Sequence, residues 1–467
     1  MFQSINKKYS QQIAALTDQG ESFSYSDLKV LSESINSKIQ ERSLLFCLCQ
    51  NKPGSLIGYY TFISNSIVPL MLDASMDQEM LAKLISTYKP EYLWLPSELV
   101  SSFPEGEEKY VLLGYSLVKL NQDNPYSLQE NLALLLTTSG STGSPKLVRL
   151  SYENMEANAK SIAEYLSIDE HERPITTLPM NYSFGLSIIN SHLLKGATIL
   201  LTSKSLMEKE FWSLLKNQQA TSLSGVPYTF EILKKLRFFR MDLPALKTLT
   251  QAGGKLNIDL NKEFTEFSQQ AGKRFIVMYG QTEATARMSY LPSEYSLSKL
   301  GSIGIAIPGG KFSLIDDAGS VIDEPNSIGE LKYKGLNVSM GYAECGDDLQ
   351  KGDENNGVLY TGDLAKRDGD NFYFIVGRKK RFIKLFGNRV NLDETEQILK
   401  SYIPDCACTG EDDHLKIFIT DSERENEVRN FISAKTGIHH SAFSVRYIAE
   451  IPKNPSGKTI YSILSTL

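Results

Sequence analysis

Apolar runs alternate with amphipathic segments along the first 310 residues of the chain. The apolar runs at 44–49, 67–72 and 92–95 have the length of strands, and the segments between them, 54–66 and 77–88, have helical spacing. The same alternation recurs at 186–201 and at 261–280. Strands that alternate with helices indicate parallel-rich sheets covered on both faces, so the pattern predicts an α/β fold built from layered sheets.

The pattern changes near residue 301. Short strand-like runs separated by turn residues lie at 311–322, 329–335 and 371–377. They predict an antiparallel β-subdomain over about 301–377.

A basic, turn-rich passage follows this β-subdomain. Beyond it, the pattern predicts a helix at 392–403, a strand at 414–420 and a second helix at 423–437. About 90 residues are enough for a small domain. We therefore predict a large N-terminal domain over residues 1–378 and a small α+β C-terminal domain over 379–467.

Composition narrows the class of protein. The chain has 467 residues, of which 41% are hydrophobic and 22% are charged, as is typical of soluble globular proteins. The formal charge of −6 argues against a general nucleic-acid binder, which is normally basic. Five cysteines without framework spacing indicate reduced thiols, and the N-terminus has no long apolar segment. We expect a cytoplasmic protein.

Two features of the apolar runs bear on that expectation. Cys47 and Cys49, like Cys406 and Cys408, take alternate positions of strand-like runs, so each pair is expected to fill a core. The uncharged stretch Pro53–Leu72 contains several serines and an interior proline. It therefore predicts an amphipathic helix followed by a buried strand rather than a membrane span.

Residues 137–148, TTSGSTGSPKLV, form a polar loop between apolar runs. A glycine-rich loop between a strand and a helix can surround phosphate oxygens with backbone N–H groups, and Lys146 adds a cation suited to the β and γ phosphates. The loop lacks the Walker pattern because Pro145 precedes the lysine, and its alternative is a disordered linker. Ser151 is the expected N-cap of the helix that follows. Three residues add hydroxyl groups: Ser139, Ser141 and Thr142.

The order of motifs resembles the adenylate-forming superfamily of acyl-CoA synthetases, nonribosomal adenylation domains and luciferases. TSGSTGSPK, at 138–146, is similar to the phosphate loop of that family, and further motifs follow in the family's order over nearly the full length. The resemblance implies that residues 1–378 are an AMP-binding domain and that residues 379–467 are a mobile lid. It assigns the ATP phosphates to Thr138, Ser139, Gly140, Ser141, Thr142, Gly143 and Lys146.

MYGQTEAT, at 278–285, is similar to the adenine-and-magnesium motif of the family. Tyr279 offers a flat face to a purine, Thr282 offers a hydroxyl to the α-phosphate, and Glu283 offers a carboxylate oxygen to Mg²⁺. The alternative is a plain strand end followed by a helix that Thr282 caps. The resemblance also assigns five residues of 253–281 to the nucleotide site: Gly253, Gly254, Tyr279, Gly280 and Gln281.

YTGDLAKRDGDNFYFIVGR, at 360–378, is similar to the ribose motif. Asp363 can accept hydrogen bonds from both ribose hydroxyls, and Arg378 can add a donor; the alternative for Asp363 is a turn residue in a β-hairpin. GELKYKGLNVSMGY, at 329–342, also fits the family, and we expect it to have a structural role.

The basic passage 377–390 carries the hinge pattern of the family. The resemblance places Lys380 at the hinge, and Lys384 and Gly387 in a loop that enters the active site for the second half-reaction. The alternative is a basic surface patch.

PKNPSGKTIY, at 452–461, matches the C-terminal lysine motif. The resemblance makes Lys458 a catalytic residue that bridges the incoming carboxylate and the α-phosphate. Taken alone, it would be an ordinary tail lysine.

The resemblance implies a two-step reaction with ATP, Mg²⁺ and a thiol. A carboxylate attacks the α-phosphate and releases pyrophosphate, and a thiol of CoA or of a phosphopantetheinyl carrier protein then displaces AMP. The catalytic residues would be Thr282, Glu283, Lys384 and Lys458.

LPMNYSFGLS, at 178–187, resembles the motif that lines the acyl pocket, with Asn181, Tyr182, Gly254 and Gly280 as pocket residues. It contains no acidic residue that could pair with a buried substrate ammonium, so we expect a carboxylic acid without a free α-amine. Asn181 could hydrogen-bond a hydroxyl group on the acid. Two alternatives remain: a catalytically idle nucleotide-binding module of the same fold, and an amino-acid adenylating enzyme.

Overall fold

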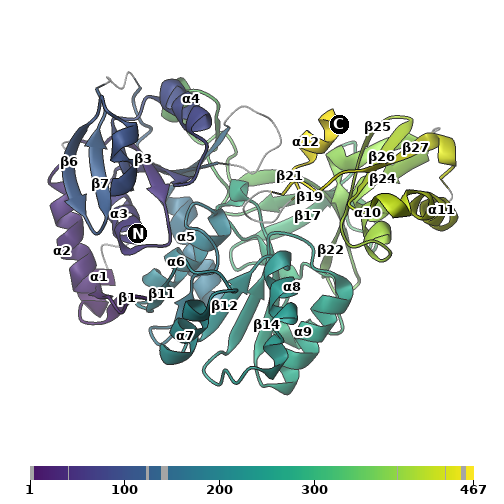
Figure 1. Cartoon of the computed structure of the whole chain (residues 1–467), viewed down its shortest axis with the longest axis horizontal. Coiled ribbons are helices and arrows are strands. Elements are labelled where there is room, and N and C mark those ends of the chain that lie inside the picture. Colours follow the sequence, from purple (N-terminus) through teal and green to yellow (C-terminus); the bar gives the residue numbers. More distant parts are fainter. Residues whose placement is uncertain are drawn as a thin grey trace. The chain divides into compact units, whose positions relative to one another are not determined.

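A computed structural model describes residues 5–39, 41–121, 126–137, 146–385, 388–436, 438–453 and 459–467 (Figure 1). Their contacts separate them into two compact units. The first contains the described residues up to 137, 146–311 and 333–359, and the second contains 312–332 and the described part of 360–467. The strands of the β-subdomain are thus grouped with the C-terminal residues, and the boundary after residue 378 stays a prediction.

The first unit contains a nine-stranded sheet whose centre is parallel. Its order is β16-β15-β14-β13-β12-β10-β11-β1-β2, in which the strands from β14 to β1 pair in parallel and the strands at both edges are antiparallel. The bounds are β1 Ile13–Thr17, β2 Ser22–Ser24, β10 Pro174–Ile175, β11 Ile199–Leu201, β12 Ser222–Gly225, β13 Thr248–Gln251, β14 Arg274–Tyr279, β15 Ser289–Tyr290 and β16 Ile305–Ala306.

The register of this sheet aligns the ends of β12, β13 and β14, and residues predicted for the nucleotide site follow the last two of these strands. Gly225 at the end of β12 pairs with Gln251, and Gln251 pairs with Val277 of β14. Because parallel strands end at the same edge of a sheet, the residues that follow these strands gather there, which is where ligands bind in open α/β sheets.

The first unit also contains an eight-stranded sheet in the order β20-β9-β8-β4-β3-β5-β7-β6. The strands β8, β4, β3 and β5 pair in parallel, and the others are antiparallel. The bounds are β3 Leu44–Cys49, β4 Val68–Asp73, β5 Tyr92–Pro96, β6 Glu107–Leu112, β7 Tyr115–Lys119, β8 Leu132–Thr137, β9 Leu147–Ser151 and β20 Gly341–Ala343.

Helices cover the sheets of this unit, and side chains cap several of them. Ser151 is the N-cap of α5, as predicted, and its hydroxyl accepts the N–H of Asn154 while Asn154 accepts the N–H of Ser151. Figure 1 shows α8 and α9 beside the strands β12 and β14. The bounds are α1 Ile5–Tyr9, α2 Tyr25–Asn36, α3 Pro53–Ser64, α4 Gln78–Tyr88, α5 Tyr152–Tyr165, α6 Ser183–Leu194, α7 Lys209–Asn217, α8 Pro227–Lys235 and α9 Ile258–Gln270.

The stretch Pro53–Leu72 forms helix α3 and most of strand β4, as predicted, but the helix is not amphipathic. Every residue from Gly54 to Ile63 is buried, because α3 lies between α2 and the strands β3 and β4 and packs on both sides. A helix buried all round is apolar all round, so its uncharged sequence reflects its place between two layers. Within the described ranges, every helix is too short or too polar to cross a bilayer.

The second unit contains a five-stranded sheet and a small α+β part. The five-stranded sheet has the order β18-β17-β19-β21-β22, with antiparallel pairs β17–β18 and β21–β22. In the α+β part, β23 and β24 form an antiparallel pair, and β25, β26 and β27 form a mixed sheet. The bounds are β17 Lys311–Ile315, β18 Val321–Ile322, β19 Ile328–Lys334, β21 Val358–Arg367, β22 Tyr373–Arg378, β23 Phe382–Leu385, β24 Asn388–Asn391, α10 Leu392–Lys400, β25 Cys406–Glu411, β26 His414–Ile419, α11 Glu425–Thr436, β27 Phe443–Tyr447 and α12 Tyr461–Thr466.

The cysteine pairs lie where the alternating pattern predicts. Cys47 and Cys49 are buried in β3, with their sulfur atoms 3.8 Å apart. Cys406 and Cys408 are buried in β25. Both pairs fill cores, as small apolar side chains do.

Candidate functional site

The turn after β14 carries the predicted adenine-and-magnesium motif. A Cβ atom at Gly280 would lie 1.7 Å from the carbonyl oxygen of Ala286, so the backbone of this turn requires glycine. The short 3₁₀ helix η3, Thr282–Ala284, follows, and Thr285 then has a φ of 65°. This tight turn presents the side chains of Tyr279, Thr282 and Glu283 at the end of a buried strand.

Two side chains of this motif contact one another. The Nε2 group of Gln281 donates a hydrogen bond to the hydroxyl of Tyr279 at 3.2 Å. Purine stacking on Tyr279 and nucleotide binding by Gln281 stay predictions.

Thr282 joins the nucleotide motif to the predicted acyl motif. Its hydroxyl lies 3.1 Å from the hydroxyl of Ser183, the first residue of α6. The predicted α-phosphate ligand is therefore in direct contact with Ser183 of the 178–187 motif.

Tyr182 and Gly253 bring the acyl motif next to the glycine pair. Gly253 has a φ of 83°, and a Cβ atom there would lie 2.7 Å from the Tyr182 hydroxyl. Burial raises the pKa of Tyr182 to about 12, so its hydroxyl stays protonated at neutral pH. The two predicted pocket residues are thus neighbours.

Asn181 has an unsatisfied polar atom. Its Oδ1 atom is buried and has no hydrogen-bond partner among the described residues. An unpaired buried acceptor is costly, which makes it a candidate partner for a donor on a ligand.

Gln251 orders the turn that contains Gly253 and Gly254, a role that the sequence did not reveal. Its side chain is buried, and Nε2 donates to the carbonyl oxygens of Ala252 at 3.2 Å and Gly254 at 2.8 Å. A buried amide of this kind holds the backbone of the glycine turn in one conformation.

Lys146 and Glu283 lie on either side of Tyr342. The Lys146 ammonium is 3.6 Å from the centre of the Tyr342 ring, and the Tyr342 hydroxyl donates to Oε1 of Glu283 at 2.8 Å. Lys146 also lies 3.5 Å from Oε1 of the exposed Glu344. The structure therefore connects the predicted phosphate cation and the predicted metal ligand through one tyrosine.

Asp363 and Arg378 are partners in the second unit. They are paired across β21 and β22, and Nε of Arg378 lies 3.4 Å from Oδ1 of Asp363. Asp363 is buried and Arg378 is exposed. This pairing is consistent with one local site, and its ribose-binding role stays a prediction.

The hinge and loop lysines lie in the same unit. Lys380 falls in the short 3₁₀ helix Lys379–Arg381, and the exposed Lys384 lies in β23, where its N–H donates to Oδ1 of Asp412 at 2.8 Å. Gly387, Lys458 and loop residues Thr138, Ser139, Gly140, Ser141, Thr142 and Gly143 lie outside the described residues.

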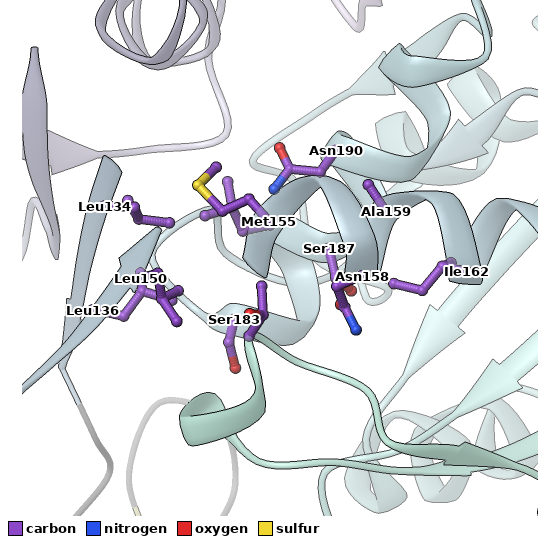
Figure 2. A pocket seen from close by; sticks show the side chains of 12 residues that line it. Leu134, Leu136, Leu150, Met155, Asn158, Ala159, Ile162, Ser183, Ser187 and Asn190 are labelled. Atoms are coloured by element: carbon purple, nitrogen blue, oxygen red, sulfur yellow. The ribbon is translucent and has the colours of Figure 1, made fainter. Parts of the chain in front are cut away.

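A small cavity lies behind the site. It is bounded by β8, β9, α5 and α6, and Figure 2 shows Ser183, Ser187, Asn158 and Asn190 among apolar neighbours. Its volume of about 10 Å³ has room for about one water molecule, so it is too small for an acyl group.

The sequence matches the family model of the AMP-binding enzymes over residues 2–343, which is most of the chain. The chain therefore belongs to the AMP-binding enzyme family, and the resemblance stated from its motifs is confirmed.

Curated relatives are similar at moderate identity. Among them are 4-coumarate–CoA ligase-like 2 of Arabidopsis thaliana, 29% identical over 73% of this chain, and luciferin 4-monooxygenase of Nipponoluciola cruciata, 27% identical over 71% of it. The match covers 62% of the length of each of these two relatives. It covers 69% of 2-succinylbenzoate–CoA ligase of Bacillus licheniformis, which is 27% identical.

Solved structures confirm the fold. The o-succinylbenzoate CoA synthetase of Bacillus subtilis, in complex with its acyl-adenylate intermediate, superposes with a TM-score of 0.80 at 20% identity, over 99% of this chain and 97% of that one. ATP-bound MatB of Rhodopseudomonas palustris gives a TM-score of 0.77 at 19% identity, with 99% and 97% covered. The predicted α/β class, with a large N-terminal part and a small α+β C-terminal part, is confirmed.

Proposed function

We propose that the chain is an ATP-dependent acid–thiol ligase, which converts a carboxylic acid into a thioester through an acyl-adenylate. Family membership and the CoA ligases among its relatives support this proposal. The observation that carries it is the arrangement of Lys146 and Glu283 about Tyr342. A cation for phosphate and a carboxylate for its metal are the two charges that a magnesium–triphosphate complex requires.

The site residues fit magnesium and ATP. One carboxylate oxygen of Glu283 accepts the Tyr342 hydroxyl, and no described residue donates a hydrogen bond to the other oxygen. A free carboxylate oxygen suits a hard cation. When bound, the magnesium ion neutralises phosphate charge.

In the first step, a carboxylate oxygen of the acid attacks the α-phosphorus, and the bond to pyrophosphate breaks. Thr282 hydrogen-bonds the α-phosphate, Lys146 holds the leaving phosphates, and Lys458 stabilises charge on the attacking carboxylate and the α-phosphate. Their contribution is positioning and electrostatic stabilisation.

In the second step, a thiol attacks the acyl carbon and releases its proton to water, and AMP leaves with the electron pair of the broken bond to the acyl group. Before this step, the segment around Lys384 takes the place of Lys458. Two lysines that serve one site in turn require a conformational change between the steps. The thiol belongs to CoA or to a phosphopantetheinyl carrier protein.

The acid is a small carboxylic acid without a free α-amine. The 178–187 segment has no carboxylate to pair with an ammonium group, and Asn181 has a buried oxygen without a partner among the described residues. A hydroxyl group on the acid would satisfy that oxygen.

A pyrophosphate-release assay tests the proposal. The full-length chain is incubated with ATP, Mg²⁺ and a panel of aliphatic, aromatic, hydroxy and amino acids, and thioester formation is then followed with CoA. Turnover with a hydroxy-substituted or simple acid supports the ligase, and Glu283→Gln should abolish it. ATP binding without turnover on any acid would favour the idle module, and turnover confined to amino acids would favour an amino-acid adenylating enzyme.

A further inference from the structure

Tyr342 is the residue that connects two distant parts of the proposed ATP site. Glu283 is 59 positions away from it, and Lys146 is further still, yet the tyrosine contacts both. Its hydroxyl binds a carboxylate oxygen and its ring face lies against an ammonium group. Charge-assisted hydrogen bonds and cation–π contacts are both directional, so each holds its charged partner in place.

The backbone at Tyr342 is itself held by Arg149. This fully buried arginine on β9 donates from Nε to the carbonyl oxygen of Tyr342 at 3.0 Å and from Nη2 to that of Met340 at 3.0 Å. The strand β20 also pairs with β9, with Tyr342 opposite Val148. The tyrosine is therefore fixed relative to the strand that Lys146 immediately precedes.

The segment before Tyr342 is held to the other side of the site. Asn337 donates from Nδ2 to the carbonyl oxygen of Ala284 at 2.9 Å, and its own carbonyl oxygen accepts from Thr285. The N–H of Ser339 donates to the carbonyl oxygen of Glu283 at 2.9 Å. Residues 337–342 thus bind both η3 and β9.

The chemistry of the phenol suits this position. A tyrosine hydroxyl keeps its proton at neutral pH and can donate it, and here it donates to Oε1 of Glu283 at 2.8 Å. It occupies one oxygen of Glu283 and leaves the other without a donor among the described residues. The ion pair of Lys146 with the exposed Glu344 is weak by comparison, because solvent screens it.

We propose that Tyr342 is a positioning residue of the ATP site: its hydroxyl orients Glu283 for the metal, and its ring orients Lys146 for the phosphates. The inference rests on the proposed ligase function. It assigns two separable roles to one side chain, and each role can be removed alone.

Binding of ATP by the full-length chain, measured by titration calorimetry in MgCl₂ and separately in EDTA, tests the inference. Tyr342→Phe keeps the ring and loses the hydroxyl. It should weaken binding in MgCl₂ by about 10-fold, the usual effect of removing a group that orients a metal ligand, and leave binding in EDTA unchanged. Tyr342→Leu should weaken binding in EDTA as well, because Lys146 then loses its ring partner.

Tyr88→Phe is the matched control. The Tyr88 hydroxyl donates to the carbonyl oxygen of Ala343 at 2.8 Å, so this variant also removes a phenol bond to β20, but not one to Glu283. It should lower the melting temperature without changing the effect of magnesium. In a Glu283→Gln background, Tyr342→Phe should have little further effect, since its partner charge is already gone.

The outcomes separate this inference from the proposed function. A wild-type chain that binds no ATP would overturn the ligase proposal and this inference together. Magnesium-dependent binding that Tyr342→Phe leaves unchanged, or that it weakens equally in EDTA, would overturn the inference alone. An equal loss of magnesium dependence in Tyr88→Phe would assign the effect to strand β20 and would also overturn it.

Discussion

Single residues of this chain have roles that only their neighbours reveal. Gly280 sits against a backbone carbonyl that leaves no room for a Cβ atom, and Tyr342 contacts a cation and a carboxylate at once. His192 on α6 is buried, and its Nδ1 atom lies 2.8 Å from the carbonyl oxygen of Ile188. Each of these residues supports a prediction that a matched control can test.

Replacing Gly280 by alanine should destabilise the first unit. A Cβ atom 1.7 Å from a carbonyl oxygen forces the turn to move, and overpacking of this kind costs about 1–3 kcal/mol. Urea unfolding measures the change, and ATP affinity should fall with it. Gly369→Ala, where nothing lies within 4 Å, should be neutral; equal effects of the two variants would contradict the steric argument.

His192 should make stability depend on pH. Burial lowers the pKa of His192 from 6.5 to about 4, and the positive charge of Arg287 is a smaller cause. Between these two pH values, the imidazole is therefore protonated in the unfolded chain and neutral in the folded chain. The free energy of unfolding should fall by about 2 kcal/mol between pH 7 and pH 5 through this group. His192→Gln should reduce that fall in urea unfolding at the two pH values.

The exposed His171 offers the control for this measurement. His171→Gln should keep the wild-type dependence on pH. A His192→Gln variant with an unchanged dependence would show that carboxylates alone account for it.

At the scale of elements, a buried carboxylate joins several parts of the C-terminal region. Glu396 of α10 accepts from the Tyr461 hydroxyl at 3.0 Å, from Lys400 at 2.7 Å, from Arg381 at 3.3 Å and from the N–H of Cys408 at 3.0 Å. Arg381 also lies 3.7 Å from the centre of the Tyr461 ring. The first residue of α12 therefore contacts α10 and the residue before β23, and the same carboxylate of Glu396 also binds β25.

Tyr461→Phe should loosen α12 without unfolding the rest of the chain. The variant removes a hydrogen bond to a buried charge, which is worth about 1.5–3 kcal/mol. Amide hydrogen exchange of α12 should become faster by a factor of about 10 or more. Tyr447→Phe, at an exposed tyrosine of β27, is the control and should leave the exchange of α12 unchanged. Equal exchange rates of α12 in the two variants would show that the hydrogen bond from Tyr461 to Glu396 does not hold α12 in place.

At the scale of the whole molecule, the residues predicted for the reaction are divided between the two compact units. Lys146, Thr282 and Glu283 belong to the first unit, and Asp363, Arg378 and Lys384 belong to the second. A ligase that uses two lysines in turn should therefore lose its two half-reactions separately.

Lys458→Ala should lower adenylate formation by about 10²–10³-fold, the usual effect of removing one such electrostatic contact. Thioester formation from supplied acyl-adenylate should remain within a few-fold of the wild type. Lys384→Ala should have the opposite effect: thioester formation from supplied acyl-adenylate should fall, and adenylate formation should remain within a few-fold of the wild type. Both half-reactions are measured by pyrophosphate release and by CoA thioester formation, and equal losses in both variants would contradict the alternation of lysines.

Hydrophobic periodicity determined the class of fold and the positions of most helices and strands, because these follow from local spacing. The capping of α5 by Ser151 was predictable from the residue type at the start of the helix, because a cap is a local hydrogen bond. Contiguous motifs identified the family and most candidate site residues, because a phosphate loop or a turn at the end of a strand consists of residues that are adjacent in sequence. The burial of each cysteine pair could also be predicted, because alternate residues of a strand face the same side.

Only the tertiary structure decided how α3 is buried and what Tyr342, Gln251 and Glu396 do. The sequence of α3 is equally apolar on all sides, and its burial depends on the layers that enclose it. The motif at 329–342 was expected to have a structural role. The two charged partners of Tyr342 come from a loop and a turn that the antiparallel pairing of β9 and β20 and the contacts of η3 bring together. Contacts between segments so far apart depend on how the sheets assemble, and no local pattern encodes them.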